Sequence, residues 1–391
     1  MQRNLHVAVV GAGAFGGWTA LHLVRQGADV TLIDAWGPAN ARASSGGETR
    51  AMRATYGTRQ VYTSLAARAL ALWRAHDERW QTGLFRKTGV LWLFGQDDAF
   101  GRASAEGLAA EGLPYEWMSP ADAAARYPQL AYDGIGSVLY EPEAGYLRAR
   151  RACEHVVERF IAEGGVFRLG AVAGPVRIER SPLTRVALDD GTALEADAFV
   201  FACGPWLGEL FPDAIGSLIT PTRQEVHYFG APAGDDRFSD VRLPVWIEVG
   251  ERVIYGIPGD RDRGFKVADD TPGPVFDPTH GSREISPDGV AAARTFLARR
   301  FPVLAGAPFL GGVVCQYEAS PDAHFVVDRH PGAENVWIAG GGSGHGFKMG
   351  PAIGEVIAGA VLGGPQPAVD WRLARFAGAA GREAAKQRKW S

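Results

Sequence analysis

The chain opens with a short apolar run, a cluster of glycines and a helical pattern of apolar residues. Val7–Val10 is continuously apolar, which is typical of a strand buried on both faces. Trp18–Gln26 then places apolar residues at helical spacing and is followed by Gly27, a residue type that commonly ends helices. Asp29–Ile33 is again largely apolar. The pattern therefore predicts a strand, a helix and a second strand in succession.

The glycines between the first strand and the helix have an informative spacing. Gly11-Ala12-Gly13-Ala14-Phe15-Gly16 follows the pattern G-x-G-x-x-G, which gives a tight turn, a close approach of the backbone to a pyrophosphate, and close packing of helix on strand. Asp34 ends the second strand, where a carboxylate accepts hydrogen bonds from ribose hydroxyls and repels a 2′-phosphate. This order of elements predicts a Rossmann-type dinucleotide site.

Helices are also predicted further along the chain. Ser119-Pro120 precedes Ala121–Arg126, and Ser286-Pro287 opens a helix that runs to about Arg300. In both cases serine is a favourable N-cap and proline a favourable first helical residue. Arg148–Gly164 has the periodicity of an amphipathic helix.

Strand patterns occur in blocks and do not alternate regularly with helices. Val166–Leu169 and Ala196–Phe201 are predicted strands, and Asp189-Asp190-Gly191 between them is typical of a hairpin turn. The stretch from Tyr228 to Lys266 is rich in β-forming residues and predicts an antiparallel sheet. The predicted fold class is α/β plus α+β, with a discontinuous Rossmann-type domain and a second domain built on an antiparallel β-sheet with helices.

Chain length favours two domains, because 391 residues are many for one hydrophobic core. We expect the chain to pass between the two domains alternately. The nucleotide-binding domain is assigned residues 1–86, 147–219 and 321–391, and the substrate domain residues 87–146 and 220–320. The arginine- and lysine-rich tail after Gly364-Pro365 is expected to form a solvated helix.

Composition argues against several functional classes. The chain is 46% apolar and 21% charged, and its net charge of −4 offers no basic stripe for nucleic acid. No apolar run approaches the roughly 18 residues that cross a membrane, and the N-terminus lacks a signal-peptide layout. The three cysteines, Cys153, Cys203 and Cys315, cannot form a disulfide framework. We expect a cytoplasmic monomer without a metal site.

Two segments suggest which dinucleotide is bound. Asp34 and Ala35 are followed by Ser44-Ser45-Gly46-Gly47-Glu48-Thr49-Arg50 and then by Arg53. Such a segment suits a loop that runs under an isoalloxazine ring into a helix, although both arginines could instead be surface residues. The second segment, Gly340-Gly341-Gly342-Ser343-Gly344-His345-Gly346-Phe347-Lys348, precedes a predicted helix whose N-terminus would stabilise an anionic flavin edge.

Taken in order, these motifs resemble the D-amino-acid-oxidase-like superfamily of FAD-dependent oxidoreductases, most closely monomeric sarcosine oxidase and N-methyltryptophan oxidase. The resemblance covers nearly the whole chain. The motifs that carry it are Gly11–Gly16, Gly47-Glu48-Thr49-Arg50 with Arg53, Tyr255-Gly256-Ile257-Pro258, Gly264-Phe265-Lys266, Cys315-Gln316-Tyr317, Asp322-Ala323-His324-Phe325 and Ser343–Lys348.

The resemblance implies FAD as the cofactor, attached through a thioether between Cys315 and the 8α-methyl group of the flavin. Arg50 matches an arginine packed against the flavin ring, and Lys266 matches the lysine beside the flavin where O₂ is activated. Other cofactor contacts are expected at Gly11, Gly13, Ala14, Phe15, Gly16, Asp34, Ala35, Ser44, Ser45, Thr49, Val172, Gly204, Trp206, Gly342, Gly344, His345, Gly346, Phe347 and Lys348.

The resemblance also implies a substrate site. Arg53 and Lys348 match the pair that binds the substrate carboxylate, and a guanidinium fork with an ammonium suits such a ligand. Tyr255 and Tyr317 match residues of the substrate pocket.

Three positions depart from sarcosine oxidase. Asp270 and Gly46 stand where that enzyme has histidines, and Trp246 stands where it has methionine. A carboxylate at position 270 would hold a cationic amine or a second basic group, or else it points to solvent. These departures put sarcosine itself in doubt as the substrate.

The sequence therefore predicts an oxidase of amino acids, preferably with a secondary amine, that forms an imine and reduces O₂ to H₂O₂. The alternatives are an oxidase of a cyclic imino acid or a glycated amino acid, and a dehydrogenase with another electron acceptor. A flavin monooxygenase would need a nicotinamide site, and the sequence shows no second Rossmann fingerprint. A non-enzymatic role would leave Arg53 and Lys348 without a purpose.

Overall fold

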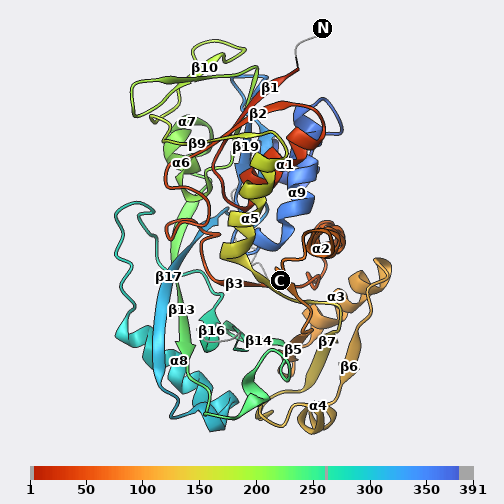
Figure 1. The fold of residues 1–391 in the computed structure, drawn as a ribbon. Coiled ribbons are helices and arrows are strands. Elements are labelled where there is room, and N and C mark those ends of the chain that lie inside the picture. Colours follow the sequence, from red (N-terminus) through yellow and green to blue (C-terminus); the bar gives the residue numbers. More distant parts are fainter. Residues whose placement is uncertain (1–3, 260–262, 378–391) are drawn as a thin grey trace.

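The computed structural model describes residues 4–259 and 263–377. Figure 1 shows two main layers of strands, a six-stranded sheet in the upper part of the view and an eight-stranded sheet below it. Strand β13 and strand β17 run from the lower sheet toward the upper one. The candidate site lies where these two sheets approach each other.

The six-stranded sheet contains the predicted nucleotide-binding unit. Its strands, in spatial order, are β18 (Val326–Arg329), β19 (Val336–Gly340), β12 (Ala198–Phe201), β1 (His6–Val10), β2 (Asp29–Asp34) and β9 (Val166–Leu169). Strand β18 pairs antiparallel with β19, and the other neighbouring pairs are parallel. The predicted strand, helix and strand at the start of the chain are thereby confirmed.

Both faces of this sheet are covered, which explains the continuous apolar run of β1. Val7 and Val9 pack in a core with helices α1 (Ala14–Arg25), α5 (Ala149–Ala162) and α9 (Gly350–Val361). Ala8 and Val10 pack on the opposite face, under the hairpin β10 (Arg185–Ala187) and β11 (Ala193–Glu195) and the short helices α6 (Leu207–Leu210) and α7 (Pro212–Ile215).

The eight-stranded sheet forms the second layer. Its order is β17 (Phe309–Ala319), β13 (Thr220–Phe229), β16 (Phe265–Asp269), β15 (Val253–Ile257), β14 (Val245–Val249), β5 (Val90–Phe94), β7 (Ser137–Glu141) and β6 (Glu116–Met118). The predicted antiparallel arrangement holds for every neighbouring pair except one. Strands β14 and β5 are parallel, so this mixed sheet joins two segments far apart in sequence.

Helices cover the second sheet where the sequence predicts them. Helix α4 (Pro120–Arg126) and helix α8 (Pro287–Arg300) both begin after a serine N-cap. The Ser119 hydroxyl accepts a hydrogen bond from the Asp122 amide at 3.1 Å, and the Ser286 hydroxyl accepts one from the Gly289 amide at 3.0 Å. The division of the chain into five domain segments stays a prediction.

A small sheet corrects the expected course of the loop that contains Arg50. The segment does not lead directly into a helix, because Thr49–Met52 is strand β3, which pairs with β8 (Gly145–Arg148) beside β4 (Phe85–Arg86). Helix α2 (Gln60–Trp80) begins only after a further loop, and α3 (Ala99–Ala110) follows later. Pairing with a distant strand therefore overrides the local pattern.

The C-terminal segment also differs from expectation. Up to Ala377 it forms two 3₁₀ helices, η6 (Val369–Trp371) and η7 (Leu373–Phe376), and Trp371 is buried, so this part is not a solvated helix. Arg382, Lys386, Arg388 and Lys389 lie outside the described residues. Within the described ranges, no helix combines the length and apolar character needed to cross a membrane.

Candidate cofactor and substrate site

A cavity of about 550 Å³ lies at the carboxyl ends of the strands in the six-stranded sheet. This is the usual ligand position in an open α/β sheet. Most of the predicted cofactor residues line it: Gly11, Gly13, Ala14, Phe15, Asp34, Ala35, Ser44, Ser45, Arg50, Val172, Gly204, Trp206, Gly342, Gly344, Gly346 and Phe347.

The glycine loop leaves the beginning of helix α1 open to a ligand. Gly13 is the N-cap, no side chain caps the helix, and the first turn carries no acidic residue. The free N–H groups and the positive helix end therefore suit a pyrophosphate. Gly11 has φ +103°, and a Cβ atom at Gly16 would lie 1.8 Å from the Gly11 carbonyl oxygen. Gly16 does not line the cavity, because its role is this close packing.

Asp34 is held at the edge of the same loop. Its Oδ2 accepts a hydrogen bond from the Ala12 amide at 2.8 Å, and its Oδ1 accepts one from the Trp36 amide at 2.9 Å. Burial raises the pKa of this carboxyl, although the backbone N–H groups oppose the shift. Asp34 lines the cavity next to Trp36 and is therefore placed to meet a ribose.

Trp36 is a cavity residue that the sequence analysis missed. Its ring lies 4.9 Å from that of Trp206, and the Arg42 guanidinium lies 5.4 Å from the Trp36 ring centroid. Trp36 remains 41% exposed, unusual for a tryptophan, because it forms part of the cavity mouth. Its position two residues after Asp34, the acid predicted to meet a ribose, was the available signal.

A second cavity, of about 50 Å³, adjoins the first. Its lining includes most of the predicted substrate residues and Cys315: Arg50, Arg53, Tyr255, Asp270, Cys315, Tyr317 and Lys348. The two cavities share Arg50, Tyr317, Gly344 and Phe347. Residues of β3, β15, β17 and the C-terminal glycine run are thus brought together at one junction.

Arg53 and Lys348 place two buried cations beside the same tyrosine. The Arg53 guanidinium lies 4.4 Å from the centroid of the Tyr56 ring, and the Lys348 ammonium donates a hydrogen bond to the Tyr56 hydroxyl at 3.0 Å. Arg53 is 4% exposed and Lys348 is 5% exposed. The alternative that Arg53 is a surface residue is therefore wrong. Burial raises the pKa of Tyr56 to about 12, so its hydroxyl stays neutral.

Arg50 lies between the glycine-rich loop and Cys315. Its Nη2 donates to the Ser44 carbonyl oxygen at 2.7 Å and to the Cys315 Sγ atom at 3.2 Å. Burial disfavours its charge, yet the interaction with Cys315 and nearby tyrosines raises its pKa overall. A cation beside a thiol promotes nucleophilic attack by the sulfur.

Lys266 is buried behind this arginine. Its Nζ donates to the Thr49 carbonyl oxygen at 3.0 Å and lies 5.2 Å from the Tyr255 ring centroid. Burial, with the Arg50 charge, lowers the pKa of Lys266 to about 7. Thr49 was expected to touch the cofactor, but it lines neither cavity. Its carbonyl oxygen instead orients Lys266 and Arg50.

Asp270 is buried in the small cavity, so the alternative that it points to solvent is wrong. It is 7% exposed, and its Oδ1 accepts a hydrogen bond from the Tyr317 hydroxyl at 2.7 Å. Burial and the Asp270 carboxylate raise the pKa of Tyr317 well above its ordinary value. The pair adds a negative charge to a cavity that also contains Arg53 and Lys348.

The other two departures from sarcosine oxidase have structural explanations. Trp246 lies in the core and lines neither cavity, with its ring 5.3 Å from that of Phe296. Side chains alternate along a strand, so Ile247 faces the small cavity in its place. Trp246 is therefore wrong as a site residue. A Cβ atom at Gly46 would lie 2.0 Å from the Asn40 carbonyl oxygen, so this loop leaves no room for a side chain.

His345, like Cys315 and Lys348, lines the small cavity and not the large one, and its cofactor contact stays a prediction. Its Nδ1 lies 3.3 Å from the Tyr56 hydroxyl, and its Nε2 lies 3.0 Å from the Ala323 carbonyl oxygen. The ring stacks on Phe325 with centroids 4.9 Å apart.

Glu318 is a second cavity residue that the sequence analysis missed. Its carboxyl occupies space left by three glycines, since a Cβ atom at Gly204 or Gly340 would lie 3.3 Å from Oε2, and one at Gly342 would lie 2.8 Å from Oε1. Within the described part of the chain, Oε2 has no hydrogen-bond partner. Burial raises the pKa of Glu318 to about 7. The carboxyl lines the large cavity.

Comparison with known proteins decides what this arrangement is. The family model of FAD dependent oxidoreductases, DAO, matches residues 6–360. The chain belongs to this family. It is 30% identical over 374 residues to monomeric sarcosine oxidase of Bacillus sp. (strain B-0618), covering 93% of this chain and 94% of the relative. It is 29% identical over 386 residues to N-methyl-L-tryptophan oxidase of Salmonella newport (strain SL254), covering 94% and 98%.

Solved structures share the fold. L-proline dehydrogenase from P. horikoshii superposes with a TM-score of 0.82 at 20% identity, covering 96% of this chain and 98% of that one. Fructosyl amine:oxygen oxidoreductase (Amadoriase I) from Aspergillus fumigatus gives 0.81 at 22% identity, covering 99% and 94%. The combination of a Rossmann-type domain with a second sheet domain is therefore confirmed.

The residues present in this DAO family member fit FAD. The open N-terminus of α1 suits its pyrophosphate, and Asp34 suits a ribose without a 2′-phosphate. The large cavity meets the small one at Arg50 and Tyr317. A cofactor that fills the large cavity therefore borders the small one.

The buried carboxyl of Glu318 should make stability depend on pH. The pKa of this carboxyl is 4.5 ordinarily and about 7 in the fold. Ionised Glu318 therefore lowers the free energy of unfolding, with no effect below about pH 4.5 and a loss that grows as pH rises. Above about pH 7 the loss amounts to about 3 kcal/mol. Glu318→Gln should raise the Tm of the FAD-free protein more at pH 8 than at pH 5. Calorimetry at both pH values measures the gain in Tm, and Glu154→Gln, at an exposed position, is the control. An equal gain at pH 5 and pH 8 would contradict a raised pKa for Glu318.

Proposed function

We propose that this FAD-dependent oxidoreductase is an amine oxidase that oxidises a small amino acid, preferably a secondary amine, at the C–H bond beside the nitrogen, with O₂ as electron acceptor. The observation that carries the proposal is the pair of buried cations, Arg53 and Lys348, in a cavity that adjoins the cofactor cavity. The named activities of the relatives, on sarcosine and N-methyl-L-tryptophan, support an N-methyl amino acid.

The two cations would bind the substrate carboxylate. Both are buried and both line the small cavity. A carboxylate between a guanidinium and an ammonium would accept charge-assisted hydrogen bonds from both, and its fixed position would hold the neighbouring C–H bond toward the cofactor cavity. Bound FAD supplies the two-electron acceptor for this bond.

Asp270 would act on the nitrogen of the substrate. Its carboxylate is fixed by the Tyr317 hydroxyl at 2.7 Å and lies in the same cavity as the two cations. An amino acid that bridges the cavity would place its amine near Asp270 and its carboxylate near Arg53. The Asp270 carboxylate can accept a hydrogen bond from the amine and take up its proton, because the hydride equivalent leaves from the neutral amine. With bound FAD as the acceptor of that hydride equivalent, the amine becomes an imine, which water hydrolyses.

The size of the cavity bears on the choice of substrate. At about 50 Å³ it suits a small N-alkyl amino acid better than a glycated one. A cyclic imino acid of similar size is the second candidate, since a compact ring bearing a secondary amine and a carboxylate meets the same three charged groups, Arg53, Lys348 and Asp270.

The function is tested by mixing the protein anaerobically with N-methyl, cyclic and basic amino acids and following the bleaching of the flavin. Bleaching by a small secondary amino acid, with H₂O₂ released once air is admitted and no NADPH added, is the expected result. Arg53→Ala should raise KM for the carboxylate substrate at least 100-fold, because it removes a charged partner of the carboxylate. An unchanged KM would place the substrate elsewhere, and reduction without peroxide would favour a dehydrogenase.

Lys266 is proposed to favour the reaction with O₂. Superoxide-like charge that develops beside a buried ammonium is stabilised electrostatically. Since burial lowers the pKa of Lys266 to about 7, reoxidation of the reduced enzyme should slow as pH rises through this value. Lys266→Met should slow reoxidation at least 100-fold, remove this pH dependence, and change anaerobic reduction much less. Stopped-flow measurement of anaerobic reduction and of reoxidation provides the check. If Lys266→Met slows the two half-reactions equally, Lys266 has no specific role in the reaction with O₂.

Cys315 is proposed to attach FAD covalently. Its sulfur lies 3.2 Å from Nη2 of Arg50, a residue that lines both cavities, and Cys315 itself lines the small cavity. Protein precipitated with trichloroacetic acid should retain yellow flavin, and Cys315→Ser should release all of it to the supernatant. Cys203→Ser is the control, because Cys203 lines the large cavity whereas Cys315 lines the small one. A colourless wild-type pellet would contradict the attachment.

A further inference from the structure

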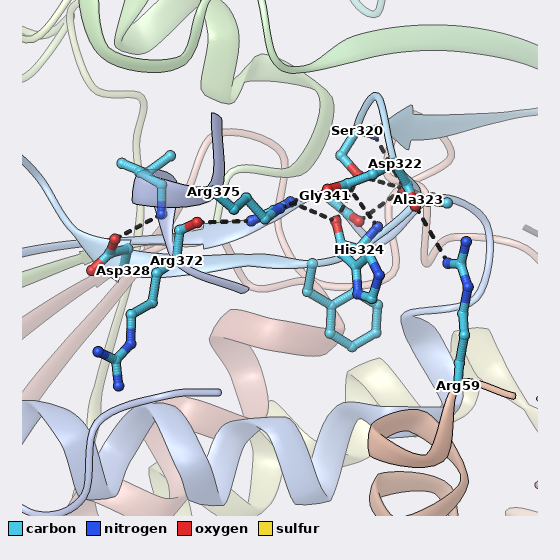
Figure 2. Close-up of polar contacts among 12 residues, drawn as sticks. Arg59, Ser320, Asp322, Ala323, His324, Asp328, Gly341, Arg372 and Arg375 are labelled. Atoms are coloured by element: carbon cyan, nitrogen blue, oxygen red, sulfur yellow. Dashed lines mark hydrogen bonds and ion pairs between the residues drawn. The ribbon is translucent and has the colours of Figure 1, made fainter. Parts of the chain in front are cut away.

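The loop Ser320–His324 is held by polar contacts with the C-terminal segment and with Arg59 (Figure 2). On its outer side, Arg375 from η7 contacts Asp322 through two hydrogen bonds, from Nε to Oδ2 at 2.8 Å and from Nη2 to Oδ1 at 3.2 Å. Nη2 also donates to the His324 carbonyl oxygen at 3.3 Å. Arg59, just before α2, donates to the Asp322 carbonyl oxygen at 3.3 Å.

The ion pair is placed to be effective. The side chains of Arg375 and Asp322 are only 13% and 16% exposed, and the fork geometry is more specific than a single contact. Burial disfavours the charge on Asp322, yet the hydrogen bonds from Arg375 hold the pKa of this carboxyl below its ordinary value. Asp322 therefore stays ionised and keeps both contacts near neutral pH.

On its inner side, the same loop holds the glycine run that follows β19. Ala323 has φ +57°, a left-handed conformation that alanine rarely adopts, and its carbonyl oxygen lies 3.0 Å from the His345 Nε2 atom. The Ser320 amide donates to the Ser343 hydroxyl at 3.1 Å. Because Asp322 Oδ1 also accepts from the His324 amide at 3.0 Å, one carboxylate fixes the backbone on both sides of Ala323.

His345 carries the connection onward to Lys348. Its Nδ1 lies 3.3 Å from the Tyr56 hydroxyl, and its carbonyl oxygen accepts a hydrogen bond from the Lys348 ammonium at 3.0 Å. The ammonium also donates to Tyr56 at 3.0 Å. His345 is 3% exposed, so it has little freedom to turn within this packing. A continuous series of contacts thus leads from Arg375 to the substrate-binding ammonium.

We propose that Arg375 and Asp322 are positioning residues for substrate binding: their pairing fixes the Ala323 carbonyl oxygen, which orients His345 and thereby the Lys348 ammonium. The inference rests on the proposed role of Lys348 in binding the substrate carboxylate. It gives the C-terminal segment a part in substrate affinity, although the described part of that segment, up to Ala377, contributes no residue to the lining of the small cavity.

The experiment uses the FAD-loaded full chain and sodium acetate as a carboxylate probe, with binding followed by the change in flavin absorbance. Arg375→Gln should weaken acetate binding at least fivefold without lowering FAD content. The matched control is Arg372→Gln, which removes the same charge from the same segment; the Arg372 Nε donates to the Pro367 carbonyl oxygen at 3.0 Å. Arg375→Lys keeps the charge but loses the forked pair of hydrogen bonds, so its acetate affinity should lie between those of wild type and Arg375→Gln. If Arg375→Gln does not fold, Arg375→Lys takes its place in the comparison.

A double-mutant cycle separates positioning from a general structural effect. Once Lys348→Met has removed the ammonium, adding Arg375→Gln should weaken acetate binding little further, because the two substitutions act through the same group. Additive losses, or an equal loss in Arg372→Gln, would overturn the proposal. If Lys348→Met itself leaves acetate affinity unchanged, the carboxylate-binding role fails instead, and that result identifies the proposed function as the error.

Discussion

The site depends on four cations held where two sheets meet. Arg53, Lys266 and Lys348 are buried and Arg50 is half-buried, and withdrawal from water disfavours such charges. Backbone carbonyl oxygens accept a hydrogen bond from each of them. Neutral acceptors fix the direction in which each cation points. Arg50, Arg53 and Lys348 therefore present oriented positive charge at the lining of the small cavity, together with the Asp270 carboxylate.

Local sequence was sufficient to predict the parts of the site whose residues lie close together along the chain. The turn at Gly11, the helix after it and Asp34 follow from one short segment, because their geometry is set by backbone sterics and strand pairing nearby. Cys315 and Tyr317 lie two apart on β17 and so share a face, but the sequence analysis named them only through the family resemblance. Their meeting with Arg53 and Lys348 was likewise inferred from family resemblance, since spacing alone does not bring β3, β17 and the glycine run together.

The errors have a common physical origin in long-range packing. Trp246 faces the core, whereas its neighbour Ile247 faces the small cavity. Adjacent residues of a strand point to opposite faces, and only the pairing of β14 with β5 and β15 decides which of the two faces the cavity. Thr49 lies in a strand whose partner is almost one hundred positions away. Glu318 gave no local signal because its space is made by glycines from two other segments.

The pairing of β1 with distant strands has a consequence for biosynthesis. The FAD-binding sheet needs β12 and then β19, and α1 completes its packing only against α9, where His22 contacts the Pro351 carbonyl oxygen at 2.9 Å. An emerging chain therefore presents its glycine loop long before the opposite wall of the cavity exists. Cofactor capture becomes a late event in folding, and FAD acts as a ligand that stabilises the finished protein.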